Sequence, residues 1–172
     1  VTERKQKEEE LRLINESILE LSKLTTLDEV FERLTEMIQS INKGSFVITS
    51  YLGEGDEFIQ LRSIKGEDKL ANKVLKLFNK VNKQGVNPEA MSKRDKKKFT
   101  SGELVELKNG LYKLTQGIFS KKVCNHLEKS LGIKKTYTIG FGRDKPLGGV
   151  SIFSQQEDLS NKGAIQTIVN YA

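Results

Sequence analysis

Cysteine, histidine, proline and tryptophan are scarce in this sequence, which has one Cys, one His, two Pro and no Trp in 172 residues. A single cysteine, Cys124, cannot close an internal disulfide. One cysteine and one histidine are also too few to assemble a zinc finger. The sequence therefore predicts a fold that is held together by its apolar core alone.

Long hydrophobic runs are absent as well. The longest apolar stretches are only a few residues, whereas a bilayer-spanning helix needs roughly 20, and nothing at the start resembles a signal peptide. We therefore expect a cytoplasmic protein that does not have a membrane as a partner.

Motifs for catalysis are also missing. There is no Gly-rich phosphate loop, no metal-binding His pair and no nucleophile in a recognisable motif with a base. The pattern predicts a domain that is not an enzyme and that has neither catalytic residues nor a metal site.

The net charge of +6 raises the question of nucleic acid. Much of the excess lies in one polar stretch, in Lys93, Arg94, Lys96, Lys97 and Lys98. A solvated basic loop explains this run more simply than a phosphate-binding patch, because no aromatic residue except Phe99 accompanies it. We expect no nucleic-acid partner, and a basic nucleic-acid-binding module stays as an alternative.

The first 24 residues are almost wholly helix-forming. Apolar residues recur at intervals of three, four and three, in Leu11, Ile14, Ile18 and Leu21, which is the spacing of a short coiled coil. So narrow a stripe buries too little to hold a lone helix. We therefore predict a helical arm over residues 1–24, which forms a homodimer through these four residues, and a globular domain over 25–172.

The globular part alternates helical and strand patterns. Thr26 and Glu29 form a predicted capping box that starts a helix through Ile41. Further helices are predicted over 68–81, 118–131 and 159–172, and strands over 46–52, 57–64, 135–141 and 149–154. Asn109-Gly110 predicts a hairpin of 103–107 with 111–115. The order indicates an α+β fold, with a central antiparallel sheet flanked by helices.

Several segments resemble known signalling modules. The opening Val1–Arg12, VTERKQKEEELR, is similar to the connector that follows a PAS domain in sensor histidine kinases. The rhythm from Leu27 to Ile38, the exit Leu131-Gly132-Ile133, the strand Thr136–Phe141, the run Leu147–Val150 into Ile152, and the closing Ile165–Ala172 resemble a GAF domain. The resemblance implies a GAF/PAS-like sheet of about six strands, a small-molecule pocket, dimeric terminal helices, a last helix that is truncated here, and adjacent signalling domains.

The predicted helix 118–131 contains the one thiol and the one imidazole of the sequence, which are candidates for binding a cofactor. Cys124 and His126 lie on opposite edges of one apolar stripe, roughly 160° apart. The stripe is formed by Phe119, Val123, Leu127 and Leu131. A joint Cys-His metal site is therefore disfavoured. A small buried hydrophobe is the simplest interpretation of Cys124, and a surface or packing role is the simplest for His126.

The same helix also resembles the Cys-His helix of bilin-binding GAF domains, in which a Cys thioether anchors the chromophore. Asn125 interrupts that pattern, and no Asp-Ile-Pro segment is found. Haem is the other chromophore that a thiol and an imidazole could hold. The cofactor, if there is one, is left open.

Tyr137 and Ile139 alternate along one predicted strand and are candidates either for pocket lining or for sheet core. The Asn-Lys-Phe-Asp-Glu signature of cyclic-nucleotide GAF domains is absent. The resemblance thus implies a sensory domain that binds a small molecule and relays its state through dimeric helices. A haem or bilin sensor anchored at Cys124 and a ligand-free dimerisation scaffold stay as alternatives.

Overall fold

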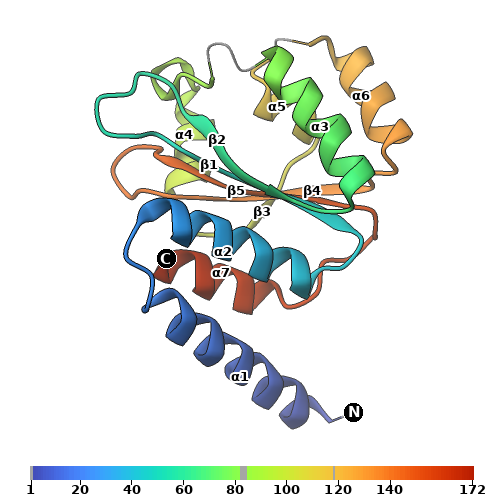
Figure 1. The fold of residues 1–172 in the computed structure, drawn as a ribbon. Coiled ribbons are helices and arrows are strands. Elements are labelled where there is room, and N and C mark those ends of the chain that lie inside the picture. Colours follow the sequence, from blue (N-terminus) through green and yellow to red (C-terminus); the bar gives the residue numbers. More distant parts are fainter. Residues whose placement is uncertain (1, 82–84, 118) are drawn as a thin grey trace.

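The computed structural model describes residues 2–81, 85–117 and 119–172, without the side chains of residues 68, 70 and 77–81. Its centre is an antiparallel sheet with the strand order β2-β1-β5-β4-β3 (Figure 1). The strands are β1 (Ser45–Tyr51), β2 (Gln60–Lys65), β3 (Val105–Glu106), β4 (Lys135–Gly140) and β5 (Gly148–Ser154). Neighbouring strands all pair antiparallel, so the predicted α+β class is confirmed.

Helices cover both faces of the sheet (Figure 1). One face carries α2 (Leu27–Ile41) and α7 (Lys162–Tyr171), with α1 (Glu3–Leu21) outside them. The other face carries α3 (Asp68–Val81), the short η1 (Pro88–Ala90), α4 (Lys93–Thr100), α5 (Gly110–Leu114) and α6 (Lys121–Ser130). Within the described residues, no helix combines the length and apolarity needed to cross a bilayer.

The strand register divides the side chains of the sheet between two cores. Val47, Ile152 and Tyr137 lie side by side on the face toward α2 and α7, where they pack with buried residues of those helices such as Ile38 and Ile168. On the opposite face, Phe46 lies beside Phe153, with the two rings stacked at a centroid distance of 4.5 Å. Because successive side chains of a strand alternate between faces, β1 and β5 contribute residues to both cores.

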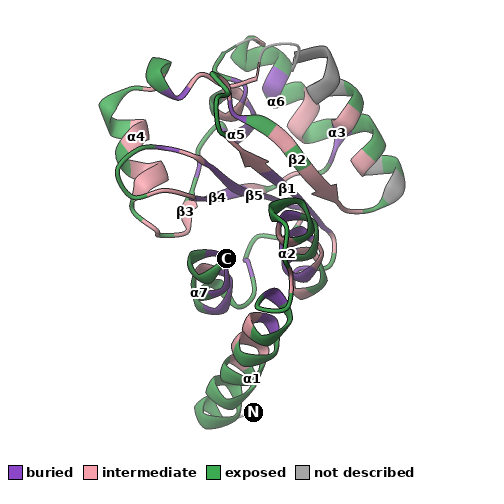
Figure 2. Cartoon of the chain, turned by 60° about the vertical axis from the view of Figure 1, so that its left-hand side comes forward, coloured by how far each residue is buried: buried purple, intermediate pink, exposed green. Residues whose placement is uncertain are grey.

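Helix α1 packs against α7 rather than standing free of the domain. Ser17 and Leu21 on its inner side are buried, and Figure 2 shows the exposed outer side along the rest of the helix. Leu21 belongs to the core beneath the sheet, so its predicted place in a dimer interface is wrong: the apolar stripe is shared with the chain's own domain. Leu11 remains 59% exposed, and Ile14 and Ile18 are half-buried.

Helix α2 begins with the predicted capping box. The Thr26 hydroxyl accepts from the Glu29 N–H, and the Glu29 carboxylate accepts from the backbone N–H of Thr25 and of Thr26. These two N–H groups hold the pKa of Glu29 below its ordinary value of 4.5. A carboxylate of this kind is stabilising when ionised.

We expect Glu29→Gln to flatten the acid dependence of stability. A group whose pKa is lower in the folded state stabilises the fold above its unfolded pKa, and the contribution is lost as the pH falls through the folded value. Wild type should therefore lose more stability than the variant on acidification below pH 4.5. Urea unfolding at a series of pH values measures this difference. Glu54→Gln, in an exposed turn, is the control, and equal slopes for wild type and Glu29→Gln would contradict the expectation.

Two local predictions are wrong. The hairpin at Asn109-Gly110 does not form: Asn109 has the positive φ of 54° that the motif favours, but it precedes the helix α5 instead of joining two strands. Leu111 and Thr115 are both buried while Lys113, midway between them, is exposed, which fits a helix and not the alternation of a strand. The basic run is also not a loop, because Ser92 accepts from the Asp95 N–H and caps the helix α4.

Candidate functional site

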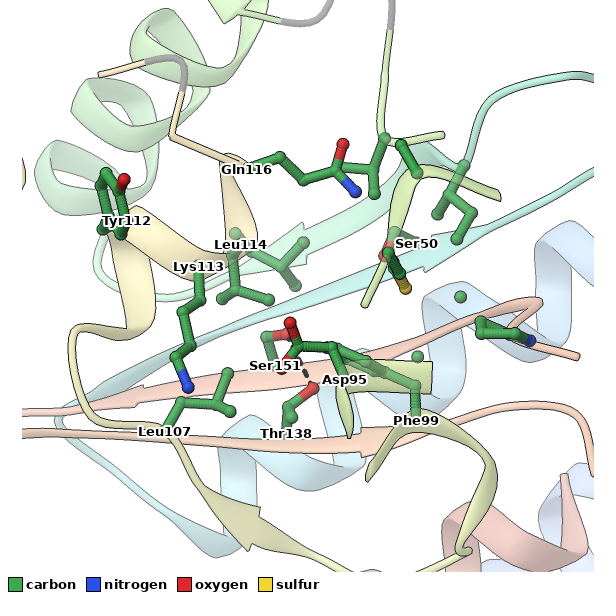
Figure 3. A pocket seen from close by; sticks show the side chains of 18 of the residues that line it. Ser50, Asp95, Phe99, Leu107, Tyr112, Lys113, Leu114, Gln116, Thr138 and Ser151 are labelled. Carbon is green, nitrogen blue, oxygen red and sulfur yellow. Dashed lines mark hydrogen bonds between the residues drawn. The ribbon is translucent and has the colours of Figure 1, made fainter. Parts of the chain in front are cut away.

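A cavity of about 530 Å³ lies on the face of the sheet away from α2 and α7 (Figure 3). Strands β1, β4 and β5 form its floor, α4 and α5 form two walls, and η1 with the preceding segment closes another side. This volume lies within the range of small-molecule sites, which are commonly 300–1,000 Å³. The cavity is therefore the candidate functional site.

The floor is open because the strands present small residues there. Ser50 lies beside Gly149, and the next row places Ser151 beside both Ile48 and Thr138. The other faces of β4 and β5 carry large residues at the adjacent positions. The register thus leaves space above the sheet, with hydroxyl groups beneath it.

The floor hydroxyls are already oriented. Thr138 Oγ1 donates to the Val150 carbonyl at 3.2 Å and lies 3.3 Å from Ser151 Oγ, the dashed pair in Figure 3. Because the Thr138 proton is engaged by a carbonyl, Ser151 is the donor in its hydrogen bond to Thr138. The Ser151 oxygen keeps a lone pair with which the floor can accept a hydrogen bond from a bound molecule.

Helix α4 approaches the sheet closely. Asp95 and Phe99, four residues apart and hence on one helix face, line the cavity. The approach depends on Gly140 of β4, since a Cβ at that position would lie 1.9 Å from the Phe99 carbonyl oxygen. Gly140 therefore sets the position of one wall.

The opposite wall comes from α5 and the turn after it. Tyr112, Lys113 and Leu114 line the cavity, and Figure 3 shows the Lys113 side chain extending from α5 toward the strands. The Gln116 side-chain amide donates to the Asn87 carbonyl at 3.3 Å. This hydrogen bond joins α5 to the segment before η1 and so links two walls across the top of the cavity.

Cys124 lies behind the cavity and not in it. Its side chain is 1% exposed and packs with Leu111, Leu131 and Phe153, and it is not among the described residues that line the cavity. Burial raises the pKa of the Cys124 thiol. A protonated, enclosed thiol is a poor nucleophile, so the position fits the simplest interpretation of Cys124 as a packing residue.

We expect Cys124 to resist alkylation in the folded protein. Its reaction with iodoacetamide should be at least about tenfold slower than in guanidinium chloride, because only the exposed thiolate reacts. Mass spectrometry of timed samples gives both rates. Rapid modification of the folded protein would show that the thiol is accessible and would reopen the covalent-chromophore alternative.

The other candidate residues of this helix are dispersed. His126 is exposed on the outer surface, and Val123 is 45% exposed beside it. Phe119 and Leu127 are half-buried and pack against the upper core. No group of three or more His, Cys, Asp or Glu side chains in the described part of the chain is placed to hold a metal ion.

Tyr137 and Ile139 point away from the cavity. Both are buried in the core toward α2 and α7, and the ammonium group of Lys162 lies 5.2 Å from the Tyr137 ring centre. Their neighbour Thr138 lines the cavity instead, because adjacent strand residues face opposite sides. The pocket-lining alternative for Tyr137 and Ile139 is therefore corrected in favour of sheet core.

Comparison with known proteins identifies solved structures with a similar fold. No family model matches the chain, and no curated protein matches it. Among solved structures, the chromophore-binding domain of the bacteriophytochrome RpBphP3 from R. palustris has a TM-score of 0.63 at 12% identity, over 99% of this chain and 60% of that chain. The GAF domain of a protein described as a sensor histidine kinase, from Pseudomonas syringae pv. tomato, has a TM-score of 0.56 at 9% identity, over 98% and 85%.

A third similar structure is the GAF domain of the cyanobacteriochrome TePixJ, with a TM-score of 0.55 at 11% identity, over 88% of this chain and 89% of that chain. Identities this low speak to fold alone. The chain has the fold of GAF domains, which confirms the resemblance to that family seen in residues 27–172. Its described sheet has five strands, one fewer than the number the resemblance suggested.

Proposed function

We propose that this chain is the sensory domain of a larger signal-transduction protein, a sensor histidine kinase or a relative of one. It binds a small molecule in the cavity above the sheet and relays occupancy to its terminal helices. The observation that carries the proposal is the cavity of about 530 Å³ over a floor of Ser50, Thr138, Gly149 and Ser151. A sheet built only for packing would fill this face with large side chains, as it does at Phe46 and Phe153.

A physical connection runs from the cavity wall to α7. After α4, the chain passes to the other layer through residues 101–104, where the Leu104 N–H donates to Gln166 Oε1 at 2.9 Å. Asn170 Nδ2 donates to the Gly102 carbonyl at 2.9 Å. A shift of α4 on ligand binding would therefore move the segment that α7 holds, and α7 packs on α1.

The output is a change in a homodimer formed through α1. Leu11 at 59% exposure, with Leu19 also at 59%, gives this helix an apolar outer surface that a second copy can cover. Half-buried Ile14 and Ile18 flank it. Residues 1–24 act as the connector to a preceding signalling domain and residues 25–172 as the sensor.

A non-covalent ligand accounts for the site better than an anchored chromophore. Cys124 is enclosed behind the wall and His126 is on the outer surface, so neither reaches the cavity. A ligand-free scaffold has no use for the open floor. The nucleic-acid alternative loses its flexible basic loop, since residues 93–100 form a helix against β4.

Ligand-dependent cross-linking tests the proposal. The reporter is Leu11→Cys in a Cys124→Ala background, and the ligand is N-phenyl-1-naphthylamine, a neutral apolar fluorophore whose binding is read by fluorescence. We expect disulfide-linked dimers, formed at a rate that the ligand changes by about twofold or more. Gln166→Ala with Asn170→Ala should remove the change and leave binding intact.

Val123→Cys is the control and should not cross-link, because Val123 belongs to α6, which lies on the far side of the domain from α1 (Figure 1). Bound fluorophore without any effect on the Leu11→Cys rate would refute the relay. A failure of Leu11→Cys to cross-link at all would refute the dimer.

A further inference from the structure

Three cations gather where α4 meets α5 at the cavity. Lys113 is a lining residue. Arg94 and Lys98 lie four residues apart on α4, on the flank next to the cavity-facing Asp95 and Phe99. Partial burial, and then the nearby charges of Lys113 and Arg94, lower the pKa of Lys98, against a smaller opposing effect of Asp95. Lys98 is therefore close enough to both cations to be repelled by them.

These cations have little compensation within the chain. Among the described side chains, no carboxylate lies within 4.0 Å of a charged nitrogen of Arg94, Lys98 or Lys113. Asp95 is the carboxylate in the cavity wall, and its Oδ2 accepts from the Ser92 hydroxyl at 2.8 Å. By contrast, Lys96 on another side of α4 pairs with Glu89 at 3.5 Å. The cavity end of α4 therefore carries unbalanced positive charge.

Clustered like charges are unfavourable unless an opposite charge lies close to them. A surface cation can turn into solvent at little cost, but Lys98 is half-buried. Lys113 is exposed, and its side chain extends along the cavity. An anion in the cavity mouth would remove the repulsion and gain charge-assisted hydrogen bonds. The remainder of the cavity is mostly apolar, with Ile48, Leu61, Leu107 and Leu114 around the hydroxyl floor.

We propose that the cavity takes an amphiphilic anion, a molecule with an apolar body and one carboxylate, sulfonate or phosphate group. Lys113 and Lys98 hold the acidic group, with Arg94 beside them, while Leu107, Leu114 and Phe99 contact the body. The inference rests on the proposed function and names the ligand class of the same cavity. The proposal also gives the basic run a role, because two of its five cations, Arg94 and Lys98, lie at the entrance of the cavity.

A matched pair of fluorophores tests the charge directly. 8-Anilinonaphthalene-1-sulfonate differs from N-phenyl-1-naphthylamine only by its sulfonate. We expect the sulfonate to bind at least about tenfold more tightly, a difference of about 1.4 kcal/mol. The double variant Lys113→Gln with Lys98→Gln should raise the dissociation constant of the sulfonate about tenfold. It should leave the dissociation constant of the neutral fluorophore within about twofold of the wild-type value.

Lys93→Gln with Lys97→Gln is the matched control, because it removes two positive charges from exposed positions of α4 that do not line the cavity. Raising the salt concentration should weaken the binding of the sulfonate and leave the binding of the neutral fluorophore unchanged. Circular dichroism of each variant confirms that the fold is intact. A Ser50→Phe variant, which fills the floor, should abolish binding of both molecules and so shows that they occupy this cavity.

The outcomes separate the two proposals. The anion assignment is overturned if the neutral fluorophore binds as tightly as the sulfonate. It is also overturned if Lys93→Gln with Lys97→Gln removes the preference for the sulfonate as fully as Lys98→Gln with Lys113→Gln does. Either result leaves the sensory function standing. If neither molecule binds, or if Ser50→Phe leaves both bound, the cavity is not the site and both proposals fail.

Discussion

Replacing Gly140 by alanine is expected to displace α4 and cost about 1–3 kcal/mol of stability. The added Cβ would lie 1.9 Å from the Phe99 carbonyl oxygen and 2.5 Å from its carbonyl carbon. Both atoms belong to backbone, so the strain can be relieved only by moving the helix. Because α4 is a wall of the cavity, binding of N-phenyl-1-naphthylamine should fall together with stability.

Urea unfolding and fluorescence titration measure the two effects of Gly140→Ala. Gly163→Ala is the control: its Cβ would meet only the flexible end of Glu10, and alanine favours the helix α7, so stability should be unchanged or raised. Retention of both wild-type stability and wild-type binding in Gly140→Ala would mean that α4 does not lie against β4 as described.

Replacing Phe153 by alanine is expected to cost about 3–5 kcal/mol. The ring is fully buried and stacks on Phe46 at 4.5 Å, with the ring planes 10° apart. This pair fills the end of the upper sheet face where the cavity stops, so its loss leaves a void that the strands cannot close. A domain with a total stability of about 5–15 kcal/mol would lose a large share of it.

Phe153→Leu provides a measurable variant if Phe153→Ala does not fold, and it should lose less because more of the volume is kept. Val123→Ala removes apolar atoms from a side chain that is 45% exposed and should cost little. Chemical unfolding of the three variants gives the comparison. Equal losses for Phe153→Leu and Val123→Ala would contradict the described packing of the Phe46–Phe153 pair.

The helices and strands with strong periodicity could be predicted from sequence. Helix α2 follows from its capping box and broad apolar face, and the alternation in β4 and β5 marks both as strands. Their pairing into one antiparallel sheet follows from the order of the elements. The confirmed GAF-like fold therefore depends on regular patterns and not on rare residues.

The regions around the cavity could not be predicted in the same way. Asn109-Gly110 favours positive φ in both a hairpin and a residue before a helix, so the dipeptide alone does not decide between them. In α4, the five basic residues favour the interpretation of a solvated loop, although Ser92 is a helix cap and Asp95 and Phe99 share the face toward the cavity. Tertiary packing on β4 decides for a helix there.

The floor of the cavity left a signal that can be seen in the sequence. In β5, Val150 and Ile152 alternate with Gly149 and Ser151, so one face is large and the other small. With both faces of a sheet covered by helices, small residues on one of them indicate space. The single cysteine, Cys124, instead favours α6 as the site, and that helix lies behind the cavity.

A small molecule that binds in the cavity above the sheet and displaces α4 should change the surroundings of the cavity residues and of α7. Methyl NMR of the protein titrated with 8-anilinonaphthalene-1-sulfonate measures this change. We expect strong shifts at Ile48, Leu61, Leu107 and Leu114, weaker shifts at Ile165 and Ile168 of α7, and none at Val123. Shifts confined to Val123 and Leu127 on the outside of α6, with the cavity methyls unmoved, would contradict this expectation.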